Sequence, residues 1–155
     1  MTNEVSSSLS WLGVPLKWFN LAMTSYLQDG VSLELTKDGN TLTKSGPGVK
    51  PLLELIASGL DYSGASLKDR VTGRAAALLY LYLGIRLVET DLISSSALSL
   101  LKEKGIEVSY HQEIPAILNH ARDDFCPLEK ATQGITSPIE GLKIIRETLA
   151  KMARK

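Results

Sequence analysis

The sequence predicts a three-layer α-β-α domain built on a mixed sheet of about five strands, with a hairpin at its start. Three observations lead to this class. Apolar residues alternate over 31–37, directly before Asp38-Gly39, which is a strong hairpin turn signal. Beyond residue 50, helical segments alternate with short strand-like runs, as in sheets with parallel strands. The length of 155 residues suits one domain with its own core.

The first elements are a helix and a hairpin. Residues 18–28 can form a helix that Asp29-Gly30 ends. The alternating segment 31–37 is the first strand, and residues 41–44 return after the turn. Pro51 lies in the first turn of the next helix, where its missing N–H costs little, and Gly59 ends that helix.

The second half reads as strand, helix, strand, helix, strand. The predicted bounds are 65–68, 69–83, 87–93, a helix from Ser94 or Ser95 to about 104, and 106–110. Asp69 is the predicted N-cap of the long helix, and Gly84 is its C-cap. The order predicts a sheet whose second half is largely parallel.

The tail contains two similar helix starts. They are Cys126-Pro127-Leu128-Glu129 and Ser137-Pro138-Ile139-Glu140. A capping residue, a proline at the first helical position and a glutamate two residues later are typical of a helix N-terminus. The second motif is predicted to begin the final helix.

Composition and charge exclude several classes of protein. The 17 Lys plus Arg residues balance 17 Asp plus Glu residues, which argues against a nucleic-acid binder that uses a strong basic field. The single cysteine excludes a scaffold held by disulfides. The longest apolar run, 75–85, is too short to span a bilayer, and the first residues lack the pattern of a secretory signal. We therefore expect a cytoplasmic protein with no nucleic-acid or membrane partner.

The domain organisation is predicted as an apolar extension over 1–16 in front of a single domain over 17–155. Trp11, Leu12 and Val14 make the extension apolar enough to pack on its own domain or on a second subunit.

Several stretches, in their order and spacing, resemble a known family. They are 48–53, 69–77, 93–94 with 97, 105–108, 114–115, 119 and 126–129. Over about 25–150 the chain resembles an uncharacterised family, a domain of unknown function, of small prokaryotic proteins with a cytidine deaminase-like fold. The resemblance implies an αββαβαβαβ core and no assigned biochemical role. The family tends to have an arginine after the asparagine, where this chain has His120 after Asn119, and Arg122 is a candidate substitute.

The zinc chemistry of deaminases needs residues that this chain lacks at the expected places. Zinc deaminases hold the metal with a His or Cys at one helix start and two Cys at the next, beside a general-acid Glu. The corresponding starts, near residues 48–50 and 68–73, contain none of these ligands. A metal site from Cys126, Glu129 and His111 or His120 is chemically open, but this motif follows the last predicted strand. We predict no metal, no cofactor and no ordinary zinc-dependent deamination.

Basic residues and glycines gather instead at the two helix starts. They are Gly46, Gly48, Lys50, Lys68, Arg70, Gly73 and Arg74. Free N–H groups and positive charge at helix N-termini suit a phosphate or carboxylate. The interpretation is a pocket for a phosphorylated or nucleotide-like molecule, with Lys50 and Arg74 as charge contacts and Asp69 orienting one of them or accepting from a sugar hydroxyl. Alternatively, Asp69 only caps its helix and the basic residues are solvated.

The full set of predicted ligand-binding residues is Gly48, Lys50, Asp69, Arg70, Gly73, Arg74, Asn119, Cys126 and Glu129. Cys126 has two interpretations of its own. At a helix N-terminus its thiolate is favoured, which would make it a nucleophile beside Asn119 and His120. The alternative is a small buried cap equivalent to Ser137, since free cysteines are usually buried and inert.

Three functions follow as hypotheses. The first is a metal-free module that binds an anionic small molecule at the helix starts. The second is an enzyme with other chemistry in the same cleft, with Asp69 and Cys126 as candidate catalytic residues and Lys50 as a further participant. The third is an oligomeric scaffold without a ligand. A homodimer is expected because such folds often assemble and because the apolar extension adds a surface.

Overall fold

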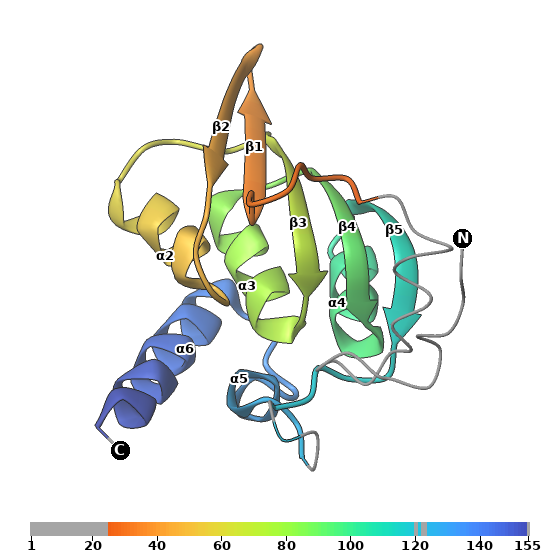
Figure 1. The fold of residues 1–155 in the computed structure, drawn as a ribbon. Coiled ribbons are helices and arrows are strands. Elements are labelled where there is room, and N and C mark those ends of the chain that lie inside the picture. Colours follow the sequence, from red (N-terminus) through yellow and green to blue (C-terminus); the bar gives the residue numbers. More distant parts are fainter. Residues whose placement is uncertain (1–24, 120, 122–123, 155) are drawn as a thin grey trace.

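The computed structural model of the chain describes residues 25–119, 121 and 124–154, and within them five strands form one sheet (Figure 1). The strands are β1 (Leu33–Lys37), β2 (Asn40–Lys44), β3 (Ser66–Thr72), β4 (Leu87–Ser94) and β5 (Glu107–Ile114). Their order in the sheet is β2-β1-β3-β4-β5. β1 is antiparallel to β2 and β3, whereas β4 is parallel to β3 and β5. The predicted mixed sheet with a parallel second half is confirmed.

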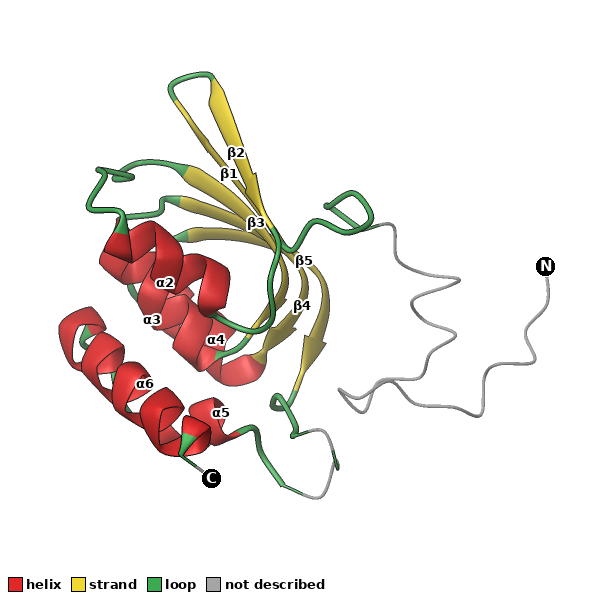
Figure 2. Ribbon diagram, turned by 60° about the vertical axis from the view of Figure 1, so that its left-hand side comes forward, coloured by secondary structure: helices red, strands yellow, loops and turns green. Residues whose placement is uncertain are grey.

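The hairpin between β1 and β2 forms where the turn signal predicts it. Asp38 has φ 53° and Gly39 has φ 80°, so both central residues are left-handed. This conformation matches the twist of the two strands, and Asp and Gly adopt it at low cost. Lys37 faces Asn40 across the turn. The hairpin projects beyond the rest of the sheet (Figure 2).

The helices of the described residues cover one face of the sheet, so a helical layer on the other face, as in an α-β-α arrangement, is not among the described residues. The helices are α2 (Lys50–Ala57), α3 (Arg74–Leu83), α4 (Ser95–Glu103), α5 (Pro127–Ala131) and α6 (Pro138–Ala153). α3 lies between α2 and α4, and α6 packs on α3 on the side away from the sheet (Figure 2). The helix predicted over 18–28 lies mostly outside the described residues, and 25–28 are not helical. The predicted extension over 1–16 also lies outside them.

The core is centred on α3. Seven of its ten residues are buried, because the sheet, two flanking helices and α6 enclose it. Ala75, Ala76 and Ala77 keep its first turns narrow and close to the sheet. Gly141 of α6 lies against Leu78, so the two helices cross at short range. No described helix has the length and apolar character needed to cross a membrane.

Most predicted caps are confirmed, and one is wrong. Ser94 accepts a hydrogen bond from Ala97 N (3.2 Å), and Gly84 ends α3 with φ 80°. Asp69 is not a helix cap, because β3 continues through Thr72 and the N-cap of α3 is Gly73. The strand continues beyond Asp69 because β4 pairs with Val71 and Thr72, although the pairing with β1 ends at Asp69.

Candidate functional site

The start of α3 is closed by a carboxylate from the same chain. Glu129 of α5 accepts hydrogen bonds from Arg74 N (2.8 Å, Oε1) and from Ile117 N (2.9 Å, Oε2). Its side chain is buried, with the residue 5% exposed. A negative charge at a helix N-terminus is stabilised by the free N–H groups and by the helix dipole. Glu129 therefore occupies the place where we expected an external anion.

Gly73 provides the space for this carboxylate. A Cβ at position 73 would lie 3.0 Å from Ile117 Cγ1 and 3.2 Å from Glu129 Oε1. The backbone at Gly73 is extended, with φ −94°, so the requirement is for space and not for a special conformation. The glycine predicted to let a ligand approach the backbone thus lets Glu129 approach it.

The guanidinium of Arg74 is also bonded within the chain. Nε and Nη2 donate to the carbonyl of Ile135 (3.1 and 2.7 Å), and Nη1 donates to Ser96 Oγ (2.8 Å) and to the carbonyl of Ser96 (3.2 Å). These bonds connect α3 to the first turn of α4 and to the loop between α5 and α6. Arg74, which was predicted as a main charge contact with a ligand, therefore holds these segments of the chain together.

Asp69 lies in the middle of β3 and contacts α3 from the side. Its Oδ2 is hydrogen-bonded to the hydroxyl of Tyr80 (2.5 Å), and its Oδ1 accepts from Arg70 N (2.8 Å). Burial raises the pKa of Asp69 to about 7, although hydrogen bonds from Tyr80 and the backbone oppose that rise. Burial and the nearby Asp69 also raise the pKa of Tyr80 well above its ordinary value.

The hydrogen bonds continue from Tyr80 into the sheet. Its hydroxyl lies 2.8 Å from Thr72 Oγ1, which lies 2.9 Å from Thr90 Oγ1. Thr90 in turn donates to the carbonyl of Leu92 (3.1 Å). Tyr80, Thr72 and Thr90 are fully buried. This line of polar residues was not predicted from the sequence, because Thr in a strand pattern and Tyr in a helix pattern are typical of ordinary packing positions.

Arg70 extends away from the helices and holds the segment that precedes β1. Its guanidinium donates to the carbonyls of Val31 (2.9 Å) and Gln28 (2.5 Å) and to Ser25 Oγ (3.2 Å). Asp91 lies 3.9 Å from the same guanidinium. Arg70 was predicted to bind a ligand, and the structure shows it bonded to backbone carbonyls of its own chain.

Asp91 is the centre of this second polar group. It accepts from Ser25 Oγ (2.6 Å) and from Tyr26 N (3.0 Å), and His111 Nε2 lies 3.9 Å away. The rings of Tyr26 and His111 stack with centroids 4.3 Å apart. The group, which sequence reasoning did not identify, fastens residues 25–31 to β3, β4 and β5.

The remaining predicted site residues are distributed over two regions. Cys126 precedes α5, where its N–H donates to Ile117 O (2.9 Å) and its side chain packs against the core. Asn119 N donates to Asp124 O (3.0 Å) in the loop before α5. Gly48 and Lys50 are exposed around the start of α2.

The described residues considered for metal binding do not come together, and His120, like Arg122, lies outside the described residues. Glu129 Oε1 and Oε2 accept from backbone N–H groups, and His111 stacks on Tyr26. The starts of α2 and α3 present Lys50 and Arg74 in place of metal donors. Among residues 25–119, 121 and 124–154, no three His, Cys, Asp or Glu side chains are placed to hold a metal ion.

These features define a class: an α/β domain with a mixed five-stranded sheet whose central helix start is closed by an internal glutamate. The chain belongs to the family described as a domain of unknown function, DUF1893, whose model matches residues 22–149. A DUF1893 family protein from Thermotoga maritima is similar, with 30% identity and a TM-score of 0.68, over 88% of this chain and 86% of that one. The family resemblance found in the sequence is confirmed.

Two deaminases are also among the similar solved structures. The dCMP deaminase from the cyanophage S-TIM5 is 17% identical, with a TM-score of 0.39, over 54% of this chain and 79% of that chain. A diaminohydroxyphosphoribosylaminopyrimidine deaminase/5-amino-6-(5-phosphoribosylamino)uracil reductase from Thermotoga maritima is 17% identical, with a TM-score of 0.41, over 66% of this chain and 34% of that chain. No curated protein is significantly similar to the chain.

Proposed function

We propose that this chain acts as an interaction module that associates with a second copy of itself through the hairpin of β1 and β2. One observation carries the proposal. Arg74, one of the two predicted charge contacts, is bonded to the chain itself, as are Arg70 and Glu129 of the predicted ligand-binding set. The third hypothesis from the sequence, an oligomeric scaffold, fits this arrangement better than the first.

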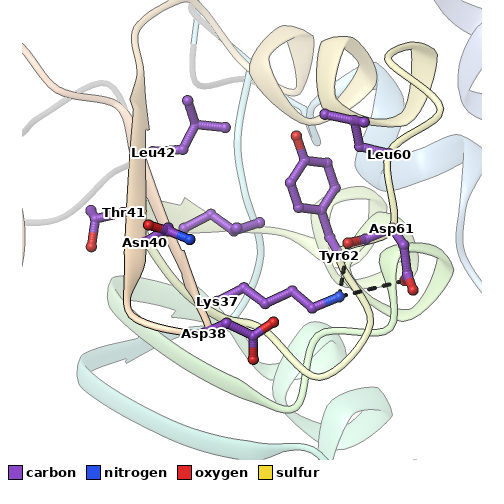
Figure 3. A pocket seen from close by; sticks show the side chains of 9 residues that line it. Lys37, Asp38, Asn40, Thr41, Leu42, Leu60, Asp61 and Tyr62 are labelled. Carbon is purple, nitrogen blue, oxygen red and sulfur yellow. Dashed lines mark hydrogen bonds and ion pairs between the residues drawn. The ribbon is translucent and has the colours of Figure 1, made fainter.

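The hairpin offers a groove for such an association. The groove has a volume of about 360 Å³ and lies between the hairpin and residues 60–62 (Figure 3). Leu42 and Leu60 flank it, with 38% and 66% of their surfaces exposed. On its polar side, the amine of Lys37 donates to the carbonyl of Asp61 (2.8 Å) and lies 3.8 Å from its carboxylate. The groove therefore combines an apolar half with a fixed ion pair.

The outer edge of β2 is also open to such an association. β2 is the first strand in the sheet order and has no strand partner on its outer side among the described residues. An unpaired edge presents free N–H and C=O groups that favour pairing with another strand. Antiparallel pairing of two copies about Leu42 would place Asn40 opposite Lys44 and Thr41 opposite Thr43. No like charges would meet, and the contact would have two-fold symmetry.

Light scattering during size-exclusion chromatography tests the association. We expect a dimer for the unmodified chain and a monomer for Leu42→Lys and for Leu60→Lys. Ile139→Lys is the matched control, because Ile139 is 75% exposed on α6, away from the hairpin. A monomeric unmodified chain at high concentration, or a dimer that tolerates both groove substitutions, would contradict the proposal.

Anion binding at the start of α2 is a second candidate. Lys50 is exposed there, and Gly48 has φ 55° with open space where a side chain would lie. A thermal-shift screen with phosphate, nucleotides and sugar phosphates tests it. Stabilisation that Lys50→Ala abolishes and Lys102→Ala preserves would favour an anion site, and no stabilisation by any of these compounds would exclude them as ligands.

The third candidate function is an enzyme whose chemistry differs from that of the zinc deaminases. Of its candidates, the carboxyl group of Asp69 is hydrogen-bonded to the buried Tyr80, and Cys126 packs against the core. Turnover that is lost on Asp69→Asn or Cys126→Ser would support this reading over the interaction module.

A further inference from the structure

A line of four hydrogen-bond contacts runs through the core where β3, β4 and α3 meet. It joins Asp69 Oδ2 to Tyr80, Tyr80 to Thr72, Thr72 to Thr90, and Thr90 to the carbonyl of Leu92. The O···O distances are 2.5, 2.8, 2.9 and 3.1 Å. Each contact requires one proton between its two oxygens.

The hydroxyl groups cannot supply all of these protons. Tyr80, Thr72 and Thr90 have one hydroxyl proton each, and the carbonyl of Leu92 has none. If Asp69 is ionised, three protons must serve four contacts. Two buried oxygens then face each other without a proton, which is costly where no water replaces it.

We infer that Asp69 carries the fourth proton in the folded protein, and that loss of this proton at raised pH weakens the junction of β3, β4 and α3. The proton lies on Oδ2, because Oδ1 already accepts from Arg70 N. With Oδ2 donating to Tyr80, every hydroxyl donates to the next group, and the line ends at the carbonyl of Leu92. Each of the four contacts then has its own proton, donated in order from Asp69 toward the carbonyl of Leu92.

The surroundings of Asp69 support a neutral acid. β1 places Leu33 opposite it, and β4 places Thr90 opposite it. The next acid along β4, Asp91, adds to the rise in pKa that burial causes. Lys68 and Arg70 flank Asp69 in sequence, but the amine of Lys68 lies 3.5 Å from the carboxylate of Glu34, and the guanidinium of Arg70 is bonded to the segment before β1. From α3 the facing titratable group is Tyr80, and burial keeps its hydroxyl protonated.

The sign of the pH effect follows from linkage. An unfolded aspartate has a pKa of about 3.9, whereas the pKa of Asp69 is raised to about 7 in the folded chain. Between these values the folded state binds the extra proton, so the free energy of unfolding falls as pH rises from about 4 to about 7. Above about pH 7 both states are ionised and this contribution has been lost.

Asp69→Asn provides the first test. The amide oxygen of the new side chain can accept from Arg70 N, and its N–H can donate to Tyr80 at any pH. Urea unfolding between pH 4.5 and 8 should show the fall in stability for the unmodified chain and no corresponding fall for Asp69→Asn. Glu103→Gln is the control, because it makes the same change from acid to amide at an exposed position at the end of α4, and it should keep the slope of the unmodified chain. Equal slopes in the unmodified and Asp69→Asn chains would overturn the inference.

Infrared spectroscopy gives a readout that does not depend on unfolding. The folded chain at pH 6 should show the carbonyl band of a protonated carboxyl group, titrating near pH 7. Thr72→Val removes the contacts of Thr72 with Tyr80 and with Thr90. The hydroxyl protons of Tyr80 and Thr90 then suffice for the two remaining contacts, so Asp69 no longer has to supply a proton. The band should therefore titrate at lower pH in this variant. Absence of the band in the unmodified chain at pH 6, or an unchanged titration in Thr72→Val, would overturn the inference.

Discussion

A single glutamate decides what the start of α3 can do. Both carboxylate oxygens of Glu129 accept hydrogen bonds from backbone N–H groups, one from Arg74 and one from Ile117. It therefore satisfies a free N–H of the helix and fixes the loop after β5 at the same time. An external anion would have to displace a buried charge that is already paired with the same helix end.

Glu129→Gln is expected to destabilise the fold by about 2 kcal/mol. The amide has one accepting oxygen, so its NH₂ group must face one of the two N–H donors, and that buried donor loses its partner. Urea unfolding at pH 7 measures the change. Glu140→Gln, at an exposed position in the first turn of α6, should change the free energy of unfolding by less than about 0.5 kcal/mol. Equal effects of the two substitutions would contradict this role.

At the same scale, the sequence identified part of the site. Gly73, Arg74 and Glu129 were predicted to share a site, and they do meet at the start of α3. Whether these residues bind a ligand or one another was not predictable from residue type and position, since a glutamate near a helix start can also accept a hydrogen bond from backbone N–H groups. Asp69 was wrongly predicted as a helix N-cap because aspartate is a common capping residue. In the structure it lies in β3 and is hydrogen-bonded to Tyr80.

At the scale of elements, the crossing of α6 over α3 depends on a glycine in the middle of a helix. Gly141→Ala would gain up to about 1 kcal/mol of helix propensity in an open position. Here the new Cβ would lie 2.9 Å from Leu78 Cδ1, so overpacking costs about 1–3 kcal/mol and should dominate. We expect lower stability in thermal unfolding. In a Leu78→Ala background the Cδ1 and Cγ contacts are gone and only the Cβ of residue 78, 3.0 Å away, remains close, so the same change should cost less. An undiminished cost there would contradict the packing explanation.

Residues 25–31 are attached to the sheet mainly by Arg70 and Asp91. Arg70→Ala removes the donors to Gln28 and Val31, so this segment should open more often while the core stays folded. Amide hydrogen exchange at Tyr26 and Val31 should accelerate about tenfold, which corresponds to about 1.4 kcal/mol. Arg146→Ala on α6 is the control and should leave that exchange unchanged. Acceleration across the whole chain would show a global effect instead.

Elements with local signals were predicted well. The Asp38-Gly39 turn, the Ser94 cap and the proline starts of α5 and α6 all depend on residues within a few positions, and all are confirmed. The bounds that failed depend on distant partners. β3 runs to Thr72 because β4 pairs with it there, and β5 runs to Ile114 for the same reason. Pairing of this kind is not visible in a window of neighbouring residues.

At the scale of the whole molecule, association through the hairpin should make stability depend on concentration. If only the folded chain dimerises, the Tm rises with protein concentration by mass action. Thermal unfolding over a hundredfold range of concentration should show that rise for the unmodified chain and none for Leu42→Lys. The zero net charge of the chain favours this test, because long-range repulsion between copies is weak near neutral pH. A Tm independent of concentration would contradict association through the hairpin, and it would favour the second candidate, anion binding at the exposed Lys50 at the start of α2.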